Sequence, residues 1–260
     1  MITQLLAVLL LTPAADLSPD VLRGLPHVAD VSVMSDSDKP VKRIVHVLDL
    51  KLVDREAMQV DLKSQGITDS LEERYDAHVA SVQRVQAEQR ALLAALVAKH
   101  DLRHVFVGGI SKEDVPKFKG VMEQVDQITA NLATLRSLSE RAPDNHDLRT
   151  AIAESEAAIK AGTMYIGAAG VLAKAKNIAI SPAEDAAAFK AAMPAKASGK
   201  APVDSAKLEA RQSAIVQKVL AKSDNAVLVL DGTHDLSDNV PDECEYLRVT
   251  LRAYEAAVGE

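Results

Sequence analysis

A histidine follows an apolar segment near the carboxyl end of the chain. Residues 226–235 read AVLVLDGTHD, so the apolar run is followed at once by Asp231, a Gly-Thr turn, His234 and Asp235. In an open α/β sheet, ligands bind beyond the carboxyl ends of the strands. An imidazole can exchange a proton near neutral pH, and neighbouring carboxylates can orient it. The sequence therefore predicts that His234 belongs to a binding or catalytic site, with Asp231 and Asp235 beside it.

A second segment of the same build carries further polar groups. Residues 43–51 read RIVHVLDLK, an apolar run that ends in Asp49 and Lys51. Arg211 lies near the core-facing side of a predicted helix that precedes the His234 segment. Because three separate segments each bring a polar group to a strand end or its neighbouring helix, we expect them to meet at one sheet edge. The predicted site comprises Asp49, Lys51, Arg211 and His234.

Each of these residues also has a structural interpretation. Asp231 and Asp235 could cap the turn around His234, Asp49 and Lys51 could form an ion pair, and Arg211 could join a helix to a strand end. The set is a poor metal site, because Lys51 is protonated and cannot ligate. His234 and Asp49 are then the only side chains of the set that could ligate a metal, and two protein ligands rarely hold zinc. We predict no metal site.

Taken together, these residues resemble the superfamily of the erythromycin-esterase-like, ChaN-like haem-binding and TraB/Tiki proteins, over about residues 43–250. In that superfamily the first strand ends in Glu and then His, where Asp49 and Lys51 stand here. A second acid usually follows the next strand, where this chain has Gly108 or Gly109. The family's helical Arg is matched by Arg211, and its Gly-x-His turn by residues 232–234. The chain looks closest to uncharacterised bacterial members.

The resemblance implies three functions for the site. In the esterase-like branch a histidine paired with carboxylates activates water, so an esterase or peptidase-like hydrolase using His234 and Asp49, with or without a metal, is one hypothesis. A haem-binding protein with His234 as axial ligand is another. Because Lys51 and Gly108 replace an imidazole and a carboxylate, a degenerate site that binds or scaffolds is favoured. Lys51 should also favour the ionised form of Asp49, and with Arg211 it would suit a small anionic ligand.

The rest of the chain predicts the scaffold for this site. Strand-like and helix-like patterns alternate, which favours an α/β fold with a mainly parallel sheet flanked by helices. Residues 41–260 are interpreted as one such domain. Strands are expected at residues 44–50, 102–107, 177–180, 226–230 and 246–251. Helices are expected at residues 69–100 and 204–222 and from Pro182, and a loop at residues 194–202.

Residues 115–161 depart from this alternation. Apolar residues recur there at steps of four and three, and residues 143–145 (PDN) interrupt the pattern once. This spacing is typical of paired helices and predicts an antiparallel helical hairpin inserted into the α/β domain, although two ordinary surface helices would also fit. Such a hairpin could shield a pocket or form a homo-oligomer.

Composition excludes several classes of protein. The chain has 260 residues, 48% of them hydrophobic, with a formal charge of -7, 3% aromatic residues and no Trp. A nucleic-acid or anionic membrane surface would need clustered Lys and Arg, so neither partner is expected. A single cysteine excludes an internal disulfide.

The amino-terminal 40 residues are interpreted as a signal segment and linker. The apolar run at residues 1–11 is too short to span a bilayer but has the length of a signal-peptide core, with no Lys or Arg before it. An exported or periplasmic protein and a cytoplasmic one are therefore both compatible with the sequence. Residues 16–40 are rich in Pro, Gly, Ser and Asp and read as the linker, with a short strand near Val31.

Overall fold

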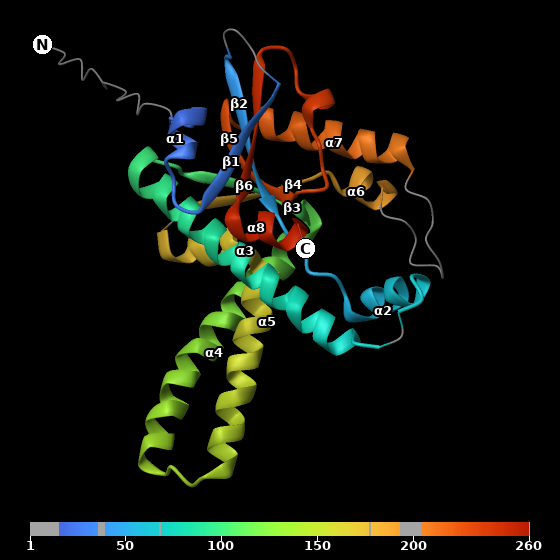
Figure 1. Cartoon of the computed structure of the whole chain (residues 1–260). Coiled ribbons are helices and arrows are strands. Elements are labelled where there is room, and N and C mark those ends of the chain that lie inside the picture. The colour runs from blue at the N-terminus through green and yellow to red at the C-terminus, as the bar shows by residue number, and fades with distance from the viewer. Residues whose placement is uncertain (1–15, 36–39, 68, 177, 193–203, 260) are drawn as a thin grey trace, which may run out of the picture.

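A six-stranded mixed sheet forms the centre of the molecule. The structure is a computed structural model, which describes residues 16–35, 40–67, 69–176, 178–192 and 204–259 (Figure 1). The strands lie in the order β1-β6-β2-β5-β3-β4, and β1 alone runs antiparallel to its neighbour. The predicted α/β class with a mainly parallel sheet is confirmed. The strands are β1 (Val28–Ser35), β2 (Lys42–Asp49), β3 (His104–Ser111), β4 (Ala179–Glu184), β5 (Asn225–Asp231) and β6 (Cys244–Leu251).

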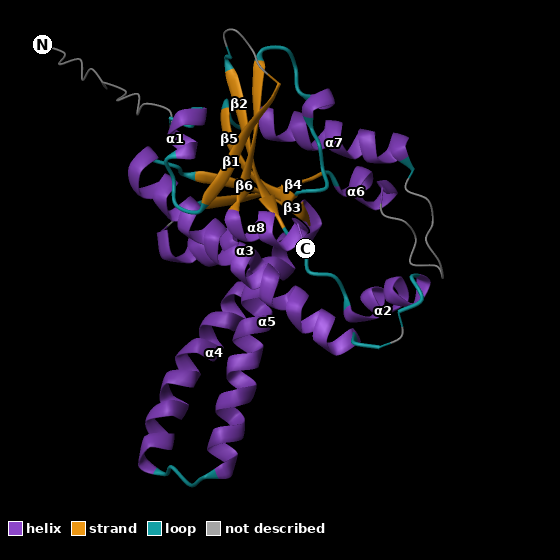
Figure 2. Ribbon diagram, in the orientation of Figure 1, coloured by secondary structure: helices purple, strands orange, loops and turns teal. Residues whose placement is uncertain are grey.

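Helices cover both faces of the sheet (Figure 2). One core joins Val45 and Val47 to α3 and to the end of α5, and the other joins Ile44 and Leu228 to α7. Because both faces are covered, residues 44–48 of β2 and 226–230 of β5 are buried, and they are apolar except for His46, as parallel strands usually are. The described helices are α1 (Pro19–Arg23), α2 (Arg55–Ser64), α3 (Leu71–His100), α4 (Val115–Arg141), α5 (His146–Lys176), α6 (Ala186–Ala192), α7 (Ser205–Leu220) and α8 (Arg252–Gly259).

The two strands that carry the predicted site lie next to each other. β2 and β5 pair in parallel, and their register places Asp49 directly beside Asp231. The backbone N–H of Gly232 then donates a hydrogen bond to the Asp49 carbonyl oxygen, at 3.0 Å. The two polar strand ends therefore meet at the carboxyl edge of the sheet.

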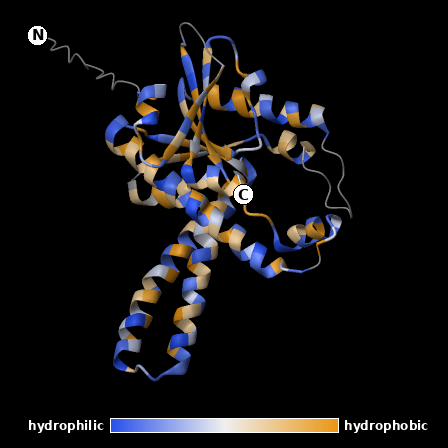
Figure 3. Ribbon diagram, viewed as in Figure 1, coloured by the Kyte–Doolittle hydropathy of each residue, from blue (hydrophilic) through white to orange (hydrophobic). Residues whose placement is uncertain are grey.

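The helices α4 and α5 lie side by side and extend away from the sheet (Figure 1). Val125 and Leu132, from the predicted apolar spacing, are buried in α4, and a Cβ on Gly162 would lie 2.4 Å from Val125 Cγ2, so these helices approach closely. Figure 3 shows apolar and hydrophilic residues alternating along both helices. The positive φ of Gly167, 64°, bends α5 where it returns to the sheet.

Three segments differ from the sequence interpretation. Residues 16–35 are interpreted from the sequence as linker with a short strand near Val31; β1 confirms that strand, but α1 and the packing of Leu22, Val28 and Val31 into the core show that the segment is not a linker. Pro182 does not begin a helix: β4 continues to Glu184, and α6 begins at Ala186. A separate helix, α2, precedes α3. The predicted signal segment at residues 1–11 and the predicted loop at residues 194–202 lie outside the described residues.

Within the described parts of the chain, no helix combines the length and apolarity needed to cross a bilayer.

Candidate functional site

A cavity of about 420 Å³ opens at the carboxyl edge of the sheet, beside α7. We call it the α7-side cavity. Asp235 does not line it; its carboxylate accepts a hydrogen bond from the Ser237 N–H, at 3.0 Å. The structure thus brings five of the six predicted site residues around one space. The residues that line the cavity are Asp49, Lys51, Gly108, Gly109, Phe189, Ala192, Leu208, Arg211, Leu230, Asp231, Thr233 and His234.

The turn after β5 delivers His234 to this cavity. The Asp231 carboxylate accepts hydrogen bonds from the Thr233 N–H, at 2.9 Å, and the Thr233 hydroxyl, at 2.7 Å. A Cβ on Gly232 would lie 1.9 Å from the Tyr254 hydroxyl, so a larger residue there would have to displace the Tyr254 ring. Asp231 therefore caps the turn, as its structural interpretation proposed, and it also lines the cavity.

The His234 ring is buried without being fully hydrogen-bonded. The residue is 6% exposed, and its Nδ1 atom has no hydrogen-bond partner among the described residues. Burial lowers the pKa of the imidazole, and so do the nearby Arg211 and Lys51 charges, whereas Asp231 and Glu184 raise it. The ring is therefore predominantly neutral at pH 7 and able to accept a proton.

Asp49 is the second unusual group of the cavity. Its Oδ1 atom accepts a hydrogen bond from Gln89 Nε2 on α3, at 2.8 Å. Burial raises the pKa of the carboxyl to about 6, and the Asp231 charge adds to the rise. The expectation that Lys51 lowers the pKa of Asp49 is wrong. Lys51 is exposed, and the desolvation of the Asp49 carboxyl outweighs its charge.

Arg211 is held by an acid that the sequence reading missed. Its guanidinium donates two hydrogen bonds to the fully buried Glu184, at 3.0 Å from Nε to Oε2 and 2.5 Å from Nη2 to Oε1. The Phe189 ring lies 4.8 Å from the Arg211 Cζ atom. Because the Glu184 carboxylate neutralises the charge of Arg211, Arg211 attracts an anionic ligand only weakly.

Glu184 brings a carboxylate beside the Gly108-Gly109 segment of β3. It ends β4, the strand next to β3, and its Oε1 atom accepts a hydrogen bond from the Gly109 N–H, at 3.0 Å. The signal was present in the sequence: proline is tolerated in an edge strand, so the apolar run from Ile178 could continue through Pro182 to Glu184.

The cavity does not favour a metal or haem. Among the described residues, no group of three His, Cys, Asp or Glu side chains could hold a metal ion. Haem needs a broad apolar surface around its axial ligand. Phe189, Leu208 and Leu230 supply one apolar side, but Asp49 and Asp231 would place carboxylates against the porphyrin.

No protein-family model matches the chain, and no curated protein or solved structure shows significant similarity to it. The assignment of the candidate site therefore rests on its geometry.

Proposed function

We propose that the protein is a hydrolase that cleaves an ester or amide bond of a small molecule in the α7-side cavity. The observation that carries this proposal is the buried His234 ring with an unpartnered Nδ1 atom, in the cavity that also holds Asp49. Burial shifts both groups toward their neutral forms, since it lowers the pKa of His234 and raises that of Asp49. Perturbed titratable groups in one cavity are typical of functional sites.

In the proposed mechanism, neutral His234 is the general base. It removes a proton from a water molecule as the water oxygen attacks the carbonyl carbon, and it later returns the proton to the departing alcohol or amine. The charges of Asp231 and Glu184 favour the imidazolium that forms between these steps. Asp49, ionised above about pH 6, accepts a hydrogen bond from the attacking water and so orients it.

Two reasons for interpreting the site as degenerate lose their force. Lys51 does not keep the pKa of Asp49 low, and an acid, Glu184, stands at the end of the strand beside β3. The remaining departure from the resembled superfamily is Lys51 itself, in place of an imidazole.

Ligand binding without turnover is the second candidate function. It is favoured by one observation: no carboxylate hydrogen-bonds to His234 Nδ1 among the described residues, although a general base is usually oriented by such a partner. In this alternative a bound ligand would supply the missing partner.

We interpret α4 and α5 as an antiparallel helical hairpin inserted in the connection from β3 to β4. Leu138, at the far end of α4, is 44% exposed, which suits a contact between copies of the chain. Sedimentation of the full chain tests this contact between copies. A dimer that dissociates in Leu138→Glu supports the contact, and a monomeric wild type rejects it.

A panel of small esters and peptides tests the proposed hydrolase. We expect turnover by the wild type and a loss of about a hundredfold or more in His234→Leu, because general base catalysis contributes at least that much. His146→Leu is the matched control, since His146 is exposed at the start of α5, far along the chain from the cavity. Equal turnover by His234→Leu and wild type would reject the mechanism. Binding of a panel member without turnover would support the second candidate.

A further inference from the structure

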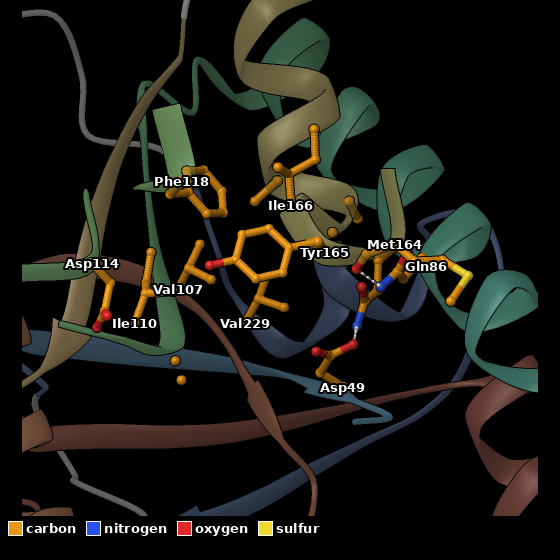
Figure 4. A pocket seen from close by; sticks show the side chains of 16 residues that line it. Asp49, Gln86, Val107, Ile110, Asp114, Phe118, Met164, Tyr165, Ile166 and Val229 are labelled. Atoms are coloured by element: carbon orange, nitrogen blue, oxygen red, sulfur yellow. Dashed lines mark hydrogen bonds between the residues drawn. The ribbon is translucent and has the colours of Figure 1, made fainter. Parts of the chain in front are cut away.

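A second cavity, of about 200 Å³, lies on the other side of the same sheet edge. We call it the α5-side cavity. It is lined by side chains of β3, β5, α3, α4 and α5, and it shares Asp49, Gly108 and Gly109 with the α7-side cavity. Figure 4 shows the rings of Phe118 and Tyr165 toward one end and Asp49 toward the other. A molecule bound here would reach the same carboxylate as the proposed substrate.

The Asp49 end of the cavity has an unused hydrogen-bond acceptor. Gln89 is 1% exposed, and its Nε2 atom donates to Asp49 Oδ1, at 2.8 Å, and to the Leu48 carbonyl oxygen, at 3.1 Å. Its Oε1 atom has no partner within the described part of the chain. A buried amide oxygen without a donor is costly, so an N–H or O–H group that reached it from the cavity would be favoured.

The charges of the lining select among such donors. Asp49 and Asp114 are the described acids that line the cavity, and none of the described lining residues is Lys, Arg or His. Hydrogen bonds from the Ser111 hydroxyl and N–H lower the pKa of Asp114, so it is ionised at neutral pH. Lys117 lies over the Tyr165 ring, with Nζ 5.3 Å from its centre, but it is not a lining residue. The lining therefore favours a cationic donor.

The other end of the cavity is apolar and aromatic. Val107, Ile110 and Val229 line it together with the two rings. Apolar walls favour a compact hydrocarbon body, and aromatic faces attract a nearby cation.

We propose that the α5-side cavity binds a primary ammonium group that carries a compact apolar or aromatic body. The ammonium donates to the Asp49 carboxylate and to Gln89 Oε1, and the body packs between Val107, Val229 and Phe118. The origin of the amine rests on the proposed function: we take the amine to be a part of the hydrolase's substrate. The binding itself needs no turnover.

Calorimetric binding of 2-phenylethylamine tests the proposal. The matched probes are 2-phenylethanol, which is neutral, and phenylacetate, which is anionic. At pH 8 we expect the amine to bind about tenfold or more tightly than the alcohol, as a charge-assisted hydrogen bond allows, and the anion not to bind. Equal affinity for amine and alcohol, or no binding of the amine, would overturn the proposal.

The pH dependence provides a second readout. Asp49 is faced by Gln89 from α3, Asp231 from β5, Lys51 after β2 and Tyr254 from α8. Because the pKa of Asp49 is raised to about 6, its carboxylate is lost as the pH falls below that value. The affinity for the amine should fall between pH 8 and pH 5, whereas that for the alcohol should stay constant. Parallel pH dependence of the two probes would contradict the assigned role of Asp49.

Three variants locate the amine. Asp49→Asn keeps the shape and an oxygen for Gln89, and it should remove both the preference for the amine and its pH dependence. Gln89→Leu should weaken amine binding about tenfold. Arg84→Leu, at an exposed position of the same helix outside the cavity lining, should bind the amine as the wild type does; a loss equal to that of Gln89→Leu would assign the effect to α3 packing. Thermal unfolding checks that each variant is folded.

The outcomes separate this inference from the proposed function. Amine binding with no turnover of any panel substrate would support the cavity assignment and reject the hydrolase. Turnover without preferential amine binding would support the hydrolase and reject the cavity assignment.

Discussion

Two buried histidines lie near the same end of the sheet in different surroundings. His46 is fully buried: Nδ1 lies 2.7 Å from the Tyr246 hydroxyl and Nε2 lies 2.9 Å from the Leu230 carbonyl oxygen. Its Nε2–H therefore donates to Leu230, and the Tyr246 hydroxyl donates to Nδ1. His234 is almost as buried, but its Nδ1 has no such partner in the described chain.

The difference indicates which buried polar groups serve the fold. A buried group with its hydrogen bonds made contributes to stability, whereas a buried group left unpaired costs free energy. His46 and the Arg211–Glu184 pair belong to the first kind. His234 Nδ1 and Gln89 Oε1 belong to the second, and these two residues line the two cavities at the sheet edge. Substitutions of the two kinds should therefore have different effects on stability.

The largest loss of stability is expected for Arg211→Met. The variant leaves Glu184 buried and uncompensated, and breaking a buried pair costs about 3–5 kcal/mol. Urea unfolding measures the change. The double variant Arg211→Met/Glu184→Gln should recover part of the loss, because no buried charge remains. No recovery would show that the ion pair with Glu184 is not what Arg211 contributes to stability.

A smaller loss is expected for His46→Leu. The substitution leaves the Tyr246 hydroxyl without its partner, at a cost of about 1–3 kcal/mol. Urea unfolding of His46→Leu and of His46→Leu/Tyr246→Phe checks the reason. The double variant should be more stable than the single one, and equal or lower stability would show that the hydrogen bond is not what His46 contributes.

Asp49→Asn should stabilise the protein at pH 8. The folded pKa of Asp49, about 6, lies above the ordinary value of 3.8, so its stabilising contribution is present at low pH and is lost as the pH rises from about 4 through 6. Asn does not titrate, and the variant should gain on the order of 1–2 kcal/mol at pH 8 and little at pH 4. Thermal unfolding at both pH values measures this difference. A variant less stable than the wild type at pH 8 would contradict the account.

The stability of the wild type must be compared with that of Asp49→Asn at each pH, because the contribution of His46 to stability has the opposite pH dependence. Burial lowers its pKa to about 4 from 6.5, so its contribution is present above pH 6.5 and is lost as the pH falls toward 4. The difference between wild type and Asp49→Asn cancels this effect.

The strands of the site could be predicted from the sequence because their composition is unambiguous. Residues 44–48 and 226–230 are apolar runs, interrupted only by His46, and an Asp follows each run; such runs are typical of strands buried on both faces. The general rule for ligand sites in parallel sheets then located Asp49 and His234. The pairing of β2 with β5 could not be predicted, because register depends on contacts between segments far apart in the chain.

The parts that could not be predicted depend on context. Glu184 was missed because a proline in an apolar run is compatible with a helix start and with an edge strand, and only the neighbouring β3 decides between them. Gln89 looked like one position of a long helix, since its bond to Asp49 spans 40 residues. The pKa of Asp49 followed burial rather than the adjacent Lys51, and burial is a property of the folded chain.

The most direct test of the account is the free energy of unfolding of His234→Leu, measured in urea beside His46→Leu. Both variants replace a buried imidazole with the same apolar side chain. Because His234 Nδ1 has no hydrogen bond to lose, His234→Leu should unfold within about 1 kcal/mol of the wild type and be more stable than His46→Leu. A loss equal to or larger than that of His46→Leu would show that His234 is retained for the fold, and would contradict its assignment to the chemistry of the site.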